Sequence, residues 1–472
     1  MFYTIPNEIE KNTFLIDSEG NQITYKEFLE IQEVFQRAID SRVVVLVLCE
    51  STPGSVMGVM SFLMNGQIPL LLESNIEMEF ILELISRYQI EYVFVPKENH
   101  TNFVNFEEVN ELRDFVLLKT GESGGETPHN DLALLLSTSG STGSPKLVRL
   151  SYQNIASNGR SIIQYLNLYE NDRAITTLPL SYSFGFSILN SHFLAGASIV
   201  LTQNSVMERE FWSLFERFSP TSLSGVPFTF EMLKRIGFLA KKSPPNLKMI
   251  TQAGGKMSDG LISEINLFSK SNDIAFFVMY GQTEATARIS YLDPRYTSEK
   301  IGSIGKAIPG GCLEVIQLGS DVELESDTVG ELVYSGPNVM LGYAENRLDL
   351  VKSDELRGRL PTGDLAKVDQ DGFFFVVGRI KRILKVYGRR VNLDEVEVLL
   401  KKHFGTVACQ GLDDNLVIFT TGDNEISDIK KFASIKFKLN HLGLRVIKVA
   451  EFPRLSNGKI NYRELETLIN EK

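Results

Sequence analysis

The chain has 472 residues, 43% of them hydrophobic, which suffices for two or three domains with cores of their own. Its formal net charge is -11, and Lys and Arg form no continuous block, which argues against a nucleic-acid partner. The three cysteines, Cys49, Cys312 and Cys409, have neither zinc-type spacing nor the density of a disulfide scaffold. A reducing compartment is therefore expected.

The first eight residues show no basic region followed by an apolar run, so they do not resemble a secretory signal. The most apolar stretches, 43–48 and 57–72, are shorter than the ~20 residues needed to cross a bilayer. The five histidines are scattered and form no metal-binding pair. We expect a cytoplasmic protein without a membrane span or a histidine-based metal site.

Short β-branched runs alternate with helical stretches through the first three quarters of the chain, as at 43–48, 92–95, 132–136 and 198–201. This alternation predicts an α/β fold with helix-covered, mainly parallel sheets. Residues 302–343 change to short alternating segments with Gly turns, which predicts a β-rich subdomain. In the last ninety residues, helix and strand patterns return. They predict a small α+β domain with helices at 394–403 and 429–442.

A loop of small hydroxyl residues and glycines runs from Ser137 to Lys146, directly after the apolar strand predicted at 132–136. Such a loop exposes backbone N–H groups, and Lys146 adds charge, so it suits a polyphosphate. It is not a Walker A loop, because Pro145 stands where a Gly should precede the Lys. The alternative is a flexible linker, but linkers seldom begin flush against a buried strand.

At this loop the sequence resembles the adenylate-forming superfamily of acyl-CoA synthetases, peptide-synthetase adenylation domains and firefly luciferase. Its signature, T-S-G-S-T-G-x-P-K, is present, although Leu147 replaces the Gly that usually follows the Lys. The resemblance implies that ATP is bound here by Thr138, Ser139, Gly140, Ser141, Thr142, Gly143 and Lys146.

A second motif, Y-G-Q-T-E at 280–284, follows the strand predicted at 274–278. An aromatic ring can stack on a purine, and a Thr hydroxyl and a Glu carboxylate suit phosphate and Mg²⁺. The resemblance assigns nucleotide binding to Tyr280, Gly281, Gln282 and Thr283, with Thr283 and Glu284 also catalytic and Glu284 the magnesium ligand. It places Ala253, Gly254 and Gly255 on the other wall of the adenine slot.

A third motif is Thr362-Gly363-Asp364, whose carboxylate can accept hydrogen bonds from two ribose hydroxyls. The resemblance gives Asp364 that role and places Arg379 beside it. Taken singly, each of these residues also suits a surface turn or a salt bridge. Their occurrence in family order favours the nucleotide site.

A fourth motif, P-x-x-x-x-G-K at 453–459, ends in Lys459, a point charge on a long stem that suits the developing charge at an α-phosphate. The resemblance makes Lys459 catalytic, Lys381 the hinge, and Lys385 and Gly388 part of the loop presented to the thiol. It thus implies a large AMP-binding domain over 1–380 and a small mobile lid domain over 381–472.

The activity implied by the resemblance is conversion of a carboxylic acid to its acyl-AMP by ATP with Mg²⁺, followed by transfer to a thiol. The thiol belongs to coenzyme A or to the phosphopantetheine of an acyl or peptidyl carrier protein, and the motifs do not separate the two. Three alternatives stay open: a stand-alone amino-acid adenylation domain, a non-catalytic nucleotide-binding homologue, and an enzyme that stops at acyl-AMP or transfers to an amine.

The acyl pocket of the resembled family is built from segments that correspond to 178–187, 225–228, 253–255 and 280–289. Within them we expect Tyr182, Phe184, Gly185 and Phe228 to bind substrate. Amino-acid-activating members carry an Asp where Gly185 stands, which disfavours an α-amino acid. The rings of Phe186 and Phe228, together with the lack of an obvious buried charge, predict an uncharged acyl or aryl group, although these rings also suit plain core positions.

Overall fold

The computed structural model describes residues 5–137, 146–387, 389–422, 424–437, 439–455 and 458–470. The chain divides into two compact units. Unit 1 comprises Met1–Cys312 and Ser335–Leu360, and unit 2 comprises Leu313–Tyr334 and Pro361–Lys472. The hinge predicted at Lys381 lies inside unit 2 and stays a prediction.

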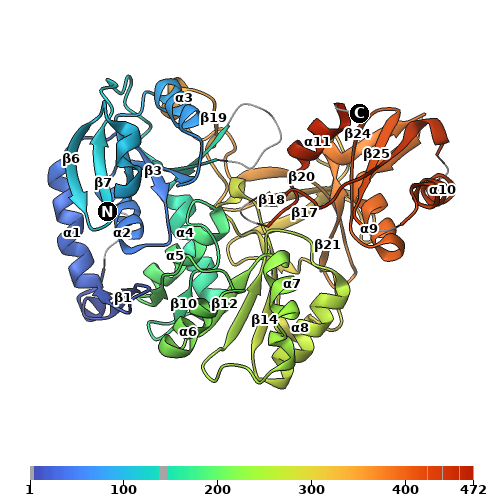
Figure 1. The fold of residues 1–472 in the computed structure, drawn as a ribbon, viewed down its shortest axis with the longest axis horizontal. Coiled ribbons are helices and arrows are strands. Elements are labelled where there is room, and N and C mark those ends of the chain that lie inside the picture. Colours follow the sequence, from blue (N-terminus) through green and yellow to red (C-terminus); the bar gives the residue numbers. More distant parts are fainter. Residues whose placement is uncertain are drawn as a thin grey trace. The chain divides into compact units, whose positions relative to one another are not determined.

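Unit 1 contains two large sheets with parallel centres and antiparallel edges (Figure 1). The first has the strand order β16 (Lys306–Ala307), β15 (Ser290–Leu292), β14 (Ala275–Tyr280), β13 (Met249–Gln252), β12 (Ser222–Gly225), β10 (Arg173–Ile175), β11 (Ser198–Val200), β1 (Thr13–Ile16) and β2 (Gln22–Thr24). The second has the order β19 (Gly342–Ala344), β9 (Leu147–Ser151), β8 (Leu132–Ser137), β4 (Ile68–Glu73), β3 (Val44–Cys49), β5 (Tyr92–Pro96), β7 (Phe115–Lys119) and β6 (Glu107–Leu112). The predicted α/β class is confirmed.

The helices of unit 1 alternate with these strands as the sequence predicts. They are α1 (Tyr25–Ala38), α2 (Pro53–Asn65), α3 (Met78–Tyr88), α4 (Tyr152–Leu166), α5 (Ser183–Leu194), α6 (Arg209–Phe218), α7 (Pro227–Arg235) and α8 (Asp259–Ser271). Local sequence fixes where α4 begins, because Ser151 and Asn154 exchange side-chain and backbone hydrogen bonds in a capping box.

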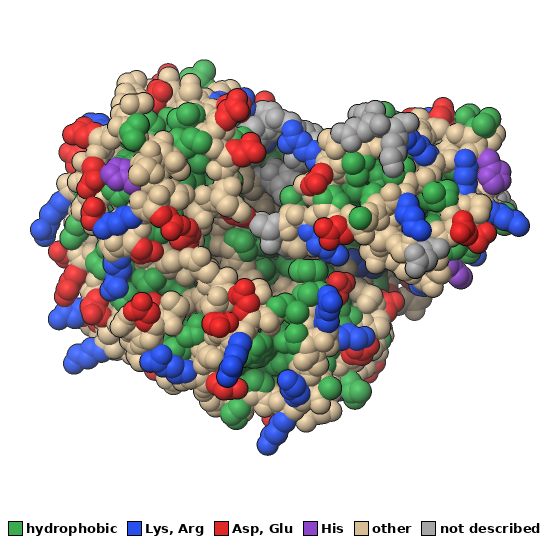
Figure 2. All heavy atoms as spheres, in the orientation of Figure 1, with side chains coloured by type: hydrophobic (Ala, Val, Ile, Leu, Met, Phe, Trp, Pro, Cys, Tyr) green, Lys and Arg blue, Asp and Glu red, His purple; other side chains and the backbone are tan. Residues whose placement is uncertain are grey.

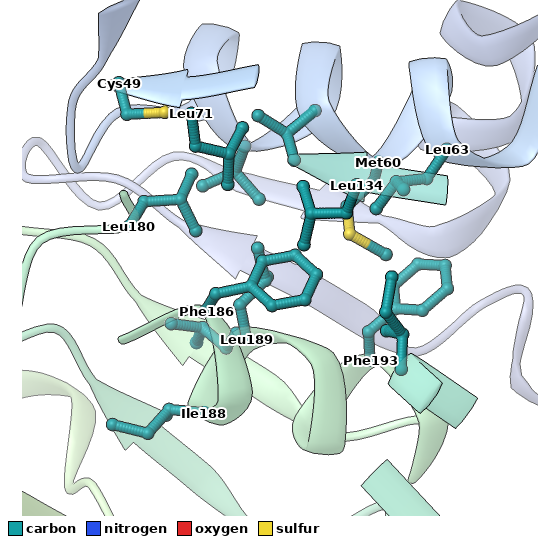
Figure 3. Packing of buried hydrophobic residues seen from close by; sticks show 14 of the residues in the cluster. Cys49, Met60, Leu63, Leu71, Leu134, Leu180, Phe186, Ile188, Leu189 and Phe193 are labelled. Carbon is teal, nitrogen blue, oxygen red and sulfur yellow. The ribbon is translucent and has the colours of Figure 1, made fainter. Parts of the chain in front are cut away.

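One cluster of buried residues draws side chains from both sheets and from α1, α2, α4 and α5. Phe186 and Leu189 of α5 lie in it with Met60 of α2 and Leu134 of β8 (Figure 3). α5 is buried along nearly its whole length, because most of its residues are apolar or small and its polar Asn190 and His192 bond to backbone carbonyls. This helix therefore begins from a fixed position. Its first turn carries Phe184 and Gly185, two of the residues predicted to line the acyl pocket, and a third, Tyr182, is its N-cap.

Unit 2 contains a four-stranded sheet, a hairpin and a three-stranded sheet covered by helices. The four-stranded sheet has the order β17 (Cys312–Ile316), β18 (Gly330–Ser335), β20 (Arg359–Val368) and β21 (Phe374–Arg379). The hairpin is β22 (Ile383–Val386) with β23 (Arg389–Asn392), and the second sheet is β24 (Val407–Leu412), β25 (Asn415–Thr420) and β26 (Leu444–Lys448). The helices are α9 (Leu393–Phe404), α10 (Ile426–Phe437) and α11 (Tyr462–Asn470).

The β-rich region and the α+β character of the C-terminal part are thus as predicted, and the helix expected at 394–403 is α9. The helix expected at 429–442 is wrong at both ends, because α10 spans Ile426–Phe437. Asn440 ends the helical region, since its side chain accepts a hydrogen bond from the Leu442 backbone N–H and caps a short 3₁₀ turn instead.

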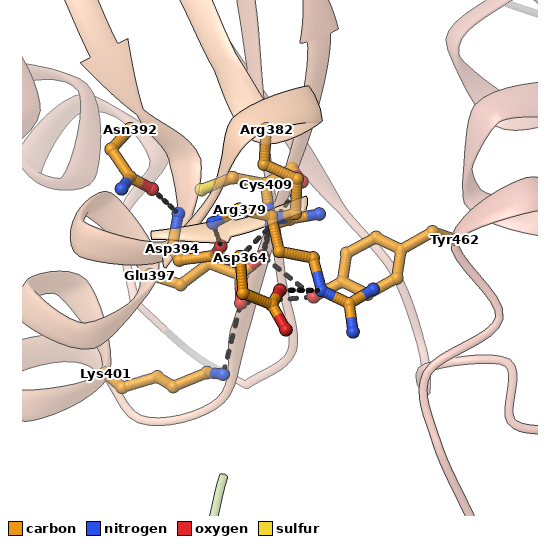
Figure 4. A network of polar contacts seen from close by, with 9 residues as sticks. All are labelled: Asp364, Arg379, Arg382, Asn392, Asp394, Glu397, Lys401, Cys409 and Tyr462. Atoms are coloured by element: carbon orange, nitrogen blue, oxygen red, sulfur yellow. Dashed lines mark hydrogen bonds and ion pairs between the residues drawn. The ribbon is translucent and has the colours of Figure 1, made fainter. Parts of the chain in front are cut away.

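Arg382 forms ion pairs with two carboxylates of α9, one of which also bonds to α11 (Figure 4). Its Nε donates to Asp394 Oδ1 at 2.6 Å, and its Nη2 donates to Glu397 Oε1 at 2.6 Å. Glu397 is buried and also accepts from the Tyr462 hydroxyl at 2.9 Å. Residues next to the predicted hinge are therefore anchored to α9 and α11.

No helix among the described residues is both long and apolar enough to cross a membrane. On the face drawn in Figure 2, acidic and basic side chains are interspersed over the surface.

We predict that Arg382→Met loosens unit 2, because it removes the closer of two cations from the buried Glu397 and leaves only the partly exposed Lys401, 3.3 Å away. Breaking a buried ion pair costs about 3–5 kcal/mol, so amides of α9 and β24 should exchange with deuterium at least about a hundredfold faster. Hydrogen exchange of the full chain, read by mass spectrometry, measures this peptide by peptide. Arg37→Met, which removes an exposed ion pair with Glu33, is the control and should change nothing. Unchanged exchange in the Arg382 variant contradicts the prediction.

Candidate active site

The four segments predicted to line the acyl and adenine pockets follow the carboxyl ends of four neighbouring strands. β10, β12, β13 and β14 are parallel and adjacent in that order. The segments that follow them are 178–187, 225–228, 253–255 and 280–289, respectively. Because the carboxyl ends of parallel strands meet at one edge of a sheet, where open α/β folds bind ligands, the topology gathers these segments in unit 1.

Three of these loops meet at Gly254, whose φ of +85° suits glycine. A Cβ at this position would lie 2.6 Å from the Tyr182 hydroxyl and 3.0 Å from Val226 Cγ1. Burial raises the pKa of Tyr182 to about 12, so its hydroxyl keeps its proton at neutral pH and can donate a hydrogen bond. The predicted Ala253 is buried beside this contact, and Gly255 is exposed.

The Y-G-Q-T-E motif begins the turn that joins β14 to β15 over residues 281–289. Gly281 lies against the next part of this turn, where a Cβ would be 1.6 Å from the carbonyl oxygen of Ala287, so no side chain fits. Tyr280 is half-buried, and Gln282 Nε2 donates to its hydroxyl at 3.4 Å. Thr283 Oγ1 donates to Ser183 Oγ at 3.2 Å, which ties the motif to the first residue of α5.

Asn338 fixes this turn from a distant part of the chain. Its buried side-chain amide donates to the carbonyl oxygens of Ala285 at 2.7 Å and Arg288 at 2.9 Å. Its own backbone carbonyl accepts a hydrogen bond from Thr286 Oγ1 at 2.7 Å. Asn338 was not predicted from the sequence, because no local pattern links it to a turn fifty residues earlier.

Glu284 and Lys146 are both placed beside Tyr343 of β19. The Tyr343 hydroxyl donates to Glu284 Oε1 at 2.8 Å, and burial together with the Glu284 charge raises the pKa of Tyr343. Lys146 Nζ lies 6.0 Å from the centroid of the Tyr343 ring and pairs with Glu345 Oε1 at 2.7 Å. The structure therefore brings the predicted phosphate lysine and the predicted magnesium ligand together, through two residues that the sequence analysis missed.

The donor set around Glu284 suits magnesium that arrives with a nucleotide. Among the described residues, no three His, Cys, Asp or Glu side chains are grouped to hold a metal ion. Mg²⁺ typically takes one or two carboxylates and completes its shell with water and phosphate oxygens, so a single carboxylate fits it. The rest of the predicted phosphate loop, Thr138, Ser139, Gly140, Ser141, Thr142 and Gly143, lies outside the described residues.

The residues predicted for the acyl group divide between the core and the pocket edge. Phe184 is buried in the core cluster, whereas Phe228 and Tyr182 are half-buried at its margin. A Cβ at Gly185 would lie 2.1 Å from the backbone carbonyl oxygen of Pro179. The backbone at 179 therefore leaves no room for the Asp that amino-acid-activating members carry at this place.

The expectation that no buried charge lines these segments is wrong. Arg288 lies in the segment 280–289, is 2% exposed, and places its guanidinium carbon 4.7 Å from the centroid of the Phe184 ring. The error arose because a single Arg after a turn is usually solvent-exposed, and nothing in the local pattern indicated that this one turns inward.

Unit 2 carries the second group of predicted residues. Asp364 on β20 and Arg379 on β21 are directly opposite in the antiparallel register, and Arg379 Nε donates to Asp364 Oδ1 at 3.0 Å (Figure 4). Asp364 is 4% exposed, and its backbone N–H donates to Thr362 Oγ1 at 3.1 Å. The expected pairing of Asp364 with Arg379 is thus present, and the ribose role of Asp364 stays a prediction.

Lys459 stands on a short turn closed by backbone hydrogen bonds. The Leu455 N–H donates to the Lys459 carbonyl oxygen at 2.8 Å, and Arg454 pairs with Ile460 in an antiparallel bridge. Lys381 and Lys385 are exposed near β22, whose Lys385 N–H donates to Asp413 Oδ1 at 2.7 Å. Gly388, the remaining residue predicted for the thiol loop, lies outside the described residues.

The fold of unit 1 and its row of loops define an adenylate-forming enzyme. Residues 6–344, well over half of the chain, match the family model described as AMP-binding enzyme. The chain therefore belongs to the AMP-binding enzyme family, which confirms the resemblance noted from the sequence.

Several relatives extend this comparison. The chain is 30% identical over 288 residues to the 2-succinylbenzoate–CoA ligase of Bacillus licheniformis, an alignment that spans 60% of this chain and 58% of that enzyme. Its identity to the Listeria innocua enzyme of the same name is 24% over 95% of each. The predicted class, an AMP-forming acid–thiol ligase, agrees with these relatives.

A solved structure shares the fold. It is o-succinylbenzoate coenzyme A synthetase (MenE) from Bacillus subtilis in complex with ATP and a magnesium ion. The TM-score is 0.77 and the sequence identity 21%, and the match covers 97% of both chains.

We predict that Gly185→Ala destabilises unit 1, because the added methyl group meets the carbonyl oxygen of Pro179 rather than a movable side chain. Overpacking of this kind costs about 1–3 kcal/mol, which thermal unfolding of the full chain should show as a lower midpoint. Gly260→Ala in α8, where a Cβ meets nothing within 4 Å, is the matched control and should be neutral or slightly stabilising. Equal thermal unfolding midpoints for the two variants would contradict the prediction, because they would show that the backbone at Pro179 shifts easily to admit the methyl group.

Proposed function

We propose that the chain uses ATP to convert a carboxylic acid to its acyl-adenylate, with release of pyrophosphate, and then transfers the acyl group to a thiol. The observation that supports this most is the gathering, at one sheet edge, of the loops that end in Gly254 and Gly281. Both glycines abut neighbouring residues so closely that a side chain would not fit, which lets the loops pack tightly against one another at this edge. The half-buried Tyr280 is the last residue of β14 and lies at the same sheet edge.

In this proposal the adenine lies between Tyr280 and the segment 253–255, and Asp364 accepts hydrogen bonds from the ribose. Lys146 and the preceding loop bind the phosphates, so Lys146 exchanges its carboxylate partner Glu345 for a phosphate oxygen. Glu284 is the residue that would hold magnesium, which when bound neutralises charge on the phosphates.

In the first half-reaction a carboxylate oxygen attacks the α-phosphorus of ATP in line, and the bond from that phosphorus to the bridging oxygen of pyrophosphate breaks. No covalent intermediate with the protein forms. Lys459 stabilises the charge that develops on the α-phosphate oxygens, because its ammonium group is compact and stands on a long flexible stem. The protein's contribution is otherwise positioning of the two reactants.

In the second half-reaction a thiolate attacks the acyl carbonyl and AMP leaves. We infer that unit 2 changes its orientation between the two steps, with Lys381 as the pivot and the loop around Lys385 and Gly388 presented to the thiol. The named relatives favour coenzyme A as the thiol, and a carrier protein's phosphopantetheine is the alternative acceptor. All three cysteines are free, which supports a reducing, cytoplasmic compartment.

The experiment that tests the proposal measures pyrophosphate release from ATP in the presence of hydroxylamine, across a panel of carboxylic acids and amino acids. Hydroxylamine traps the acyl-adenylate as a hydroxamate, so release and hydroxamate should rise together for simple acids. Amino acids should be poor substrates, because Gly185 leaves no room for a carboxylate that would bind their ammonium group. Binding of ATP without release for any acid would instead support a non-catalytic nucleotide-binding protein.

We predict that Lys459→Ala separates the two half-reactions. Pyrophosphate release should fall by about 10²–10³-fold, the usual effect of removing one group that stabilises a transition-state charge, whereas thioester formation from supplied acyl-AMP should stay near the wild-type rate. Single-turnover assays of each step provide the measurement. Lys448→Ala, at an exposed lysine of the same unit, is the control and should leave both steps unchanged. Equal loss of both steps in the Lys459 variant argues against its assigned role.

A further inference from the structure

Arg288 is a buried cation that has no acidic partner in the part of the chain that the structure describes. It is 2% exposed, and no Asp or Glu among the described residues lies within ion-pair distance of its guanidinium. The other deeply buried arginines of unit 1 are paired: Arg149 with Glu355, and Arg347 with Glu91 at 2.9 Å. A guanidinium keeps its charge in proteins, and an uncompensated buried charge costs several kcal/mol.

The groups around the Arg288 guanidinium are neutral. Its Nε donates to Ser187 Oγ at 3.2 Å, and its Nη1 donates to the Tyr165 hydroxyl at 2.9 Å and contacts Met279 Sδ at 2.8 Å. Its Nη2 has no hydrogen-bond partner among the residues that the structure describes. These contacts orient the fork of N–H groups but supply no negative charge, and such a fork matches a carboxylate well.

The backbone holds Arg288 rigidly in this position. Ala287, immediately before it, has a φ of +94°, which is strained for a residue with a side chain. The carbonyl oxygen of Arg288 accepts hydrogen bonds from Asn158 Nδ2 at 3.0 Å and Asn338 Nδ2 at 2.9 Å. A strained turn that two buried amides hold in place is typical of preorganised binding sites.

Arg288 also lies where we expect the far end of the acid substrate, the end distant from its reactive carboxylate. The loop after β14 and the first turns of α5 contact each other twice. At the first contact, Thr283 of the nucleotide motif bonds to Ser183. At the second, Arg288 bonds to Ser187, four residues further along the same helix. We place the reactive carboxylate of the acid near Thr283. If the rest of the acid runs parallel to α5 from there, it extends toward Arg288.

We propose that Arg288 binds a second carboxylate of the acid substrate, so that the substrates of this site are dicarboxylic acids activated at the carboxylate distant from Arg288. This inference rests on the proposed function and narrows its substrate class. The neighbouring rings of Phe184 and Tyr165 make the surroundings apolar, which strengthens a charge-assisted pair formed there. If Arg288 only tethers α4 to α5, its loss reduces stability and leaves substrate preference unchanged.

The test compares dicarboxylic acids with their monomethyl esters, which keep the size and remove one charge. A series of straight-chain diacids of three to eight carbons and of aromatic diacids, each with its monoester, is assayed by hydroxylamine-trapped pyrophosphate release. Wild type should prefer at least one diacid over its ester by about tenfold or more in kcat/KM, the range that a charge-assisted hydrogen bond provides. In Arg288→Met that preference should disappear through loss of diacid activity, with ester activity retained, and Arg288→Lys should retain part of it.

Arg173→Met is the control, because Arg173 is a partly buried arginine of the same unit that bonds to Ser198 and to a backbone carbonyl outside the predicted pocket. Its diacid-to-ester ratio should equal that of wild type. An equal ratio in wild type and Arg288→Met, or a wild-type preference for monoesters, overturns the inference. If Arg288→Met does not fold, the wild-type ratio and Arg288→Lys decide.

Failure of the inference is distinguishable from failure of the proposed function. If monocarboxylic acids and monoesters release pyrophosphate and form hydroxamates as well as diacids do, the adenylation activity holds and only the role of Arg288 is wrong. If no acid releases pyrophosphate although calorimetry shows that the protein binds ATP with Mg²⁺, the proposed function itself is wrong, and the inference fails with it.

Discussion

The side chain of Asn338 holds the turn on which the candidate site depends. From a buried position it bonds to carbonyl oxygens at both ends of the segment 285–288, while its own carbonyl accepts from Thr286. The same turn carries the ring, hydroxyl and carboxylate of the Y-G-Q-T-E motif and, four residues after Glu284, the buried Arg288. Because two of its residues have positive φ, the turn would relax to another conformation without these bonds. One amide thus sets the position of the predicted nucleotide, metal and acyl contacts together.

The two units contribute different physical elements to the proposed chemistry. Unit 1 provides shape, since glycines such as Gly254 and Gly281 exclude side chains where loops of neighbouring strands meet. Unit 2 provides two charged side chains. Asp364 is oriented by its hydrogen bond from Arg379, and Lys459 stands on a turn that backbone hydrogen bonds close. This division suits a reaction in two steps, because a charge on one unit can be withdrawn while the pocket on the other remains formed.

The sequence predicted those parts of the molecule that local patterns determine. Alternating apolar strands and helices indicated the α/β fold, and the motif at 280–284 begins at the end of β14 as expected, whereas the motif at 362–364 lies inside β20. Contacts between distant segments were not predictable, because no periodicity records them: Tyr343 beside Glu284, Asn338 under the turn, and the inward course of Arg288. The helix expected at 429–442 was misplaced for a related reason, since one capping side chain, Asn440, outweighed a continuing helical pattern. The sequence likewise could not show that a side chain at position 185 would clash with the backbone carbonyl of Pro179.

The proposed chemistry begins with attack of a carboxylate oxygen at the α-phosphorus of ATP, and transfer of an oxygen isotope tests this step most directly. An acid labelled with ¹⁸O in its carboxylate is turned over with ATP, Mg²⁺ and a thiol, and the nucleotide and phosphate products are analysed by mass spectrometry. We expect AMP that carries one ¹⁸O atom and pyrophosphate that carries none, because the bridging oxygen leaves with AMP when the thiol attacks the carbonyl carbon. Formation of ADP with label in inorganic phosphate would place the attack at the γ-phosphorus and contradict the proposed chemistry.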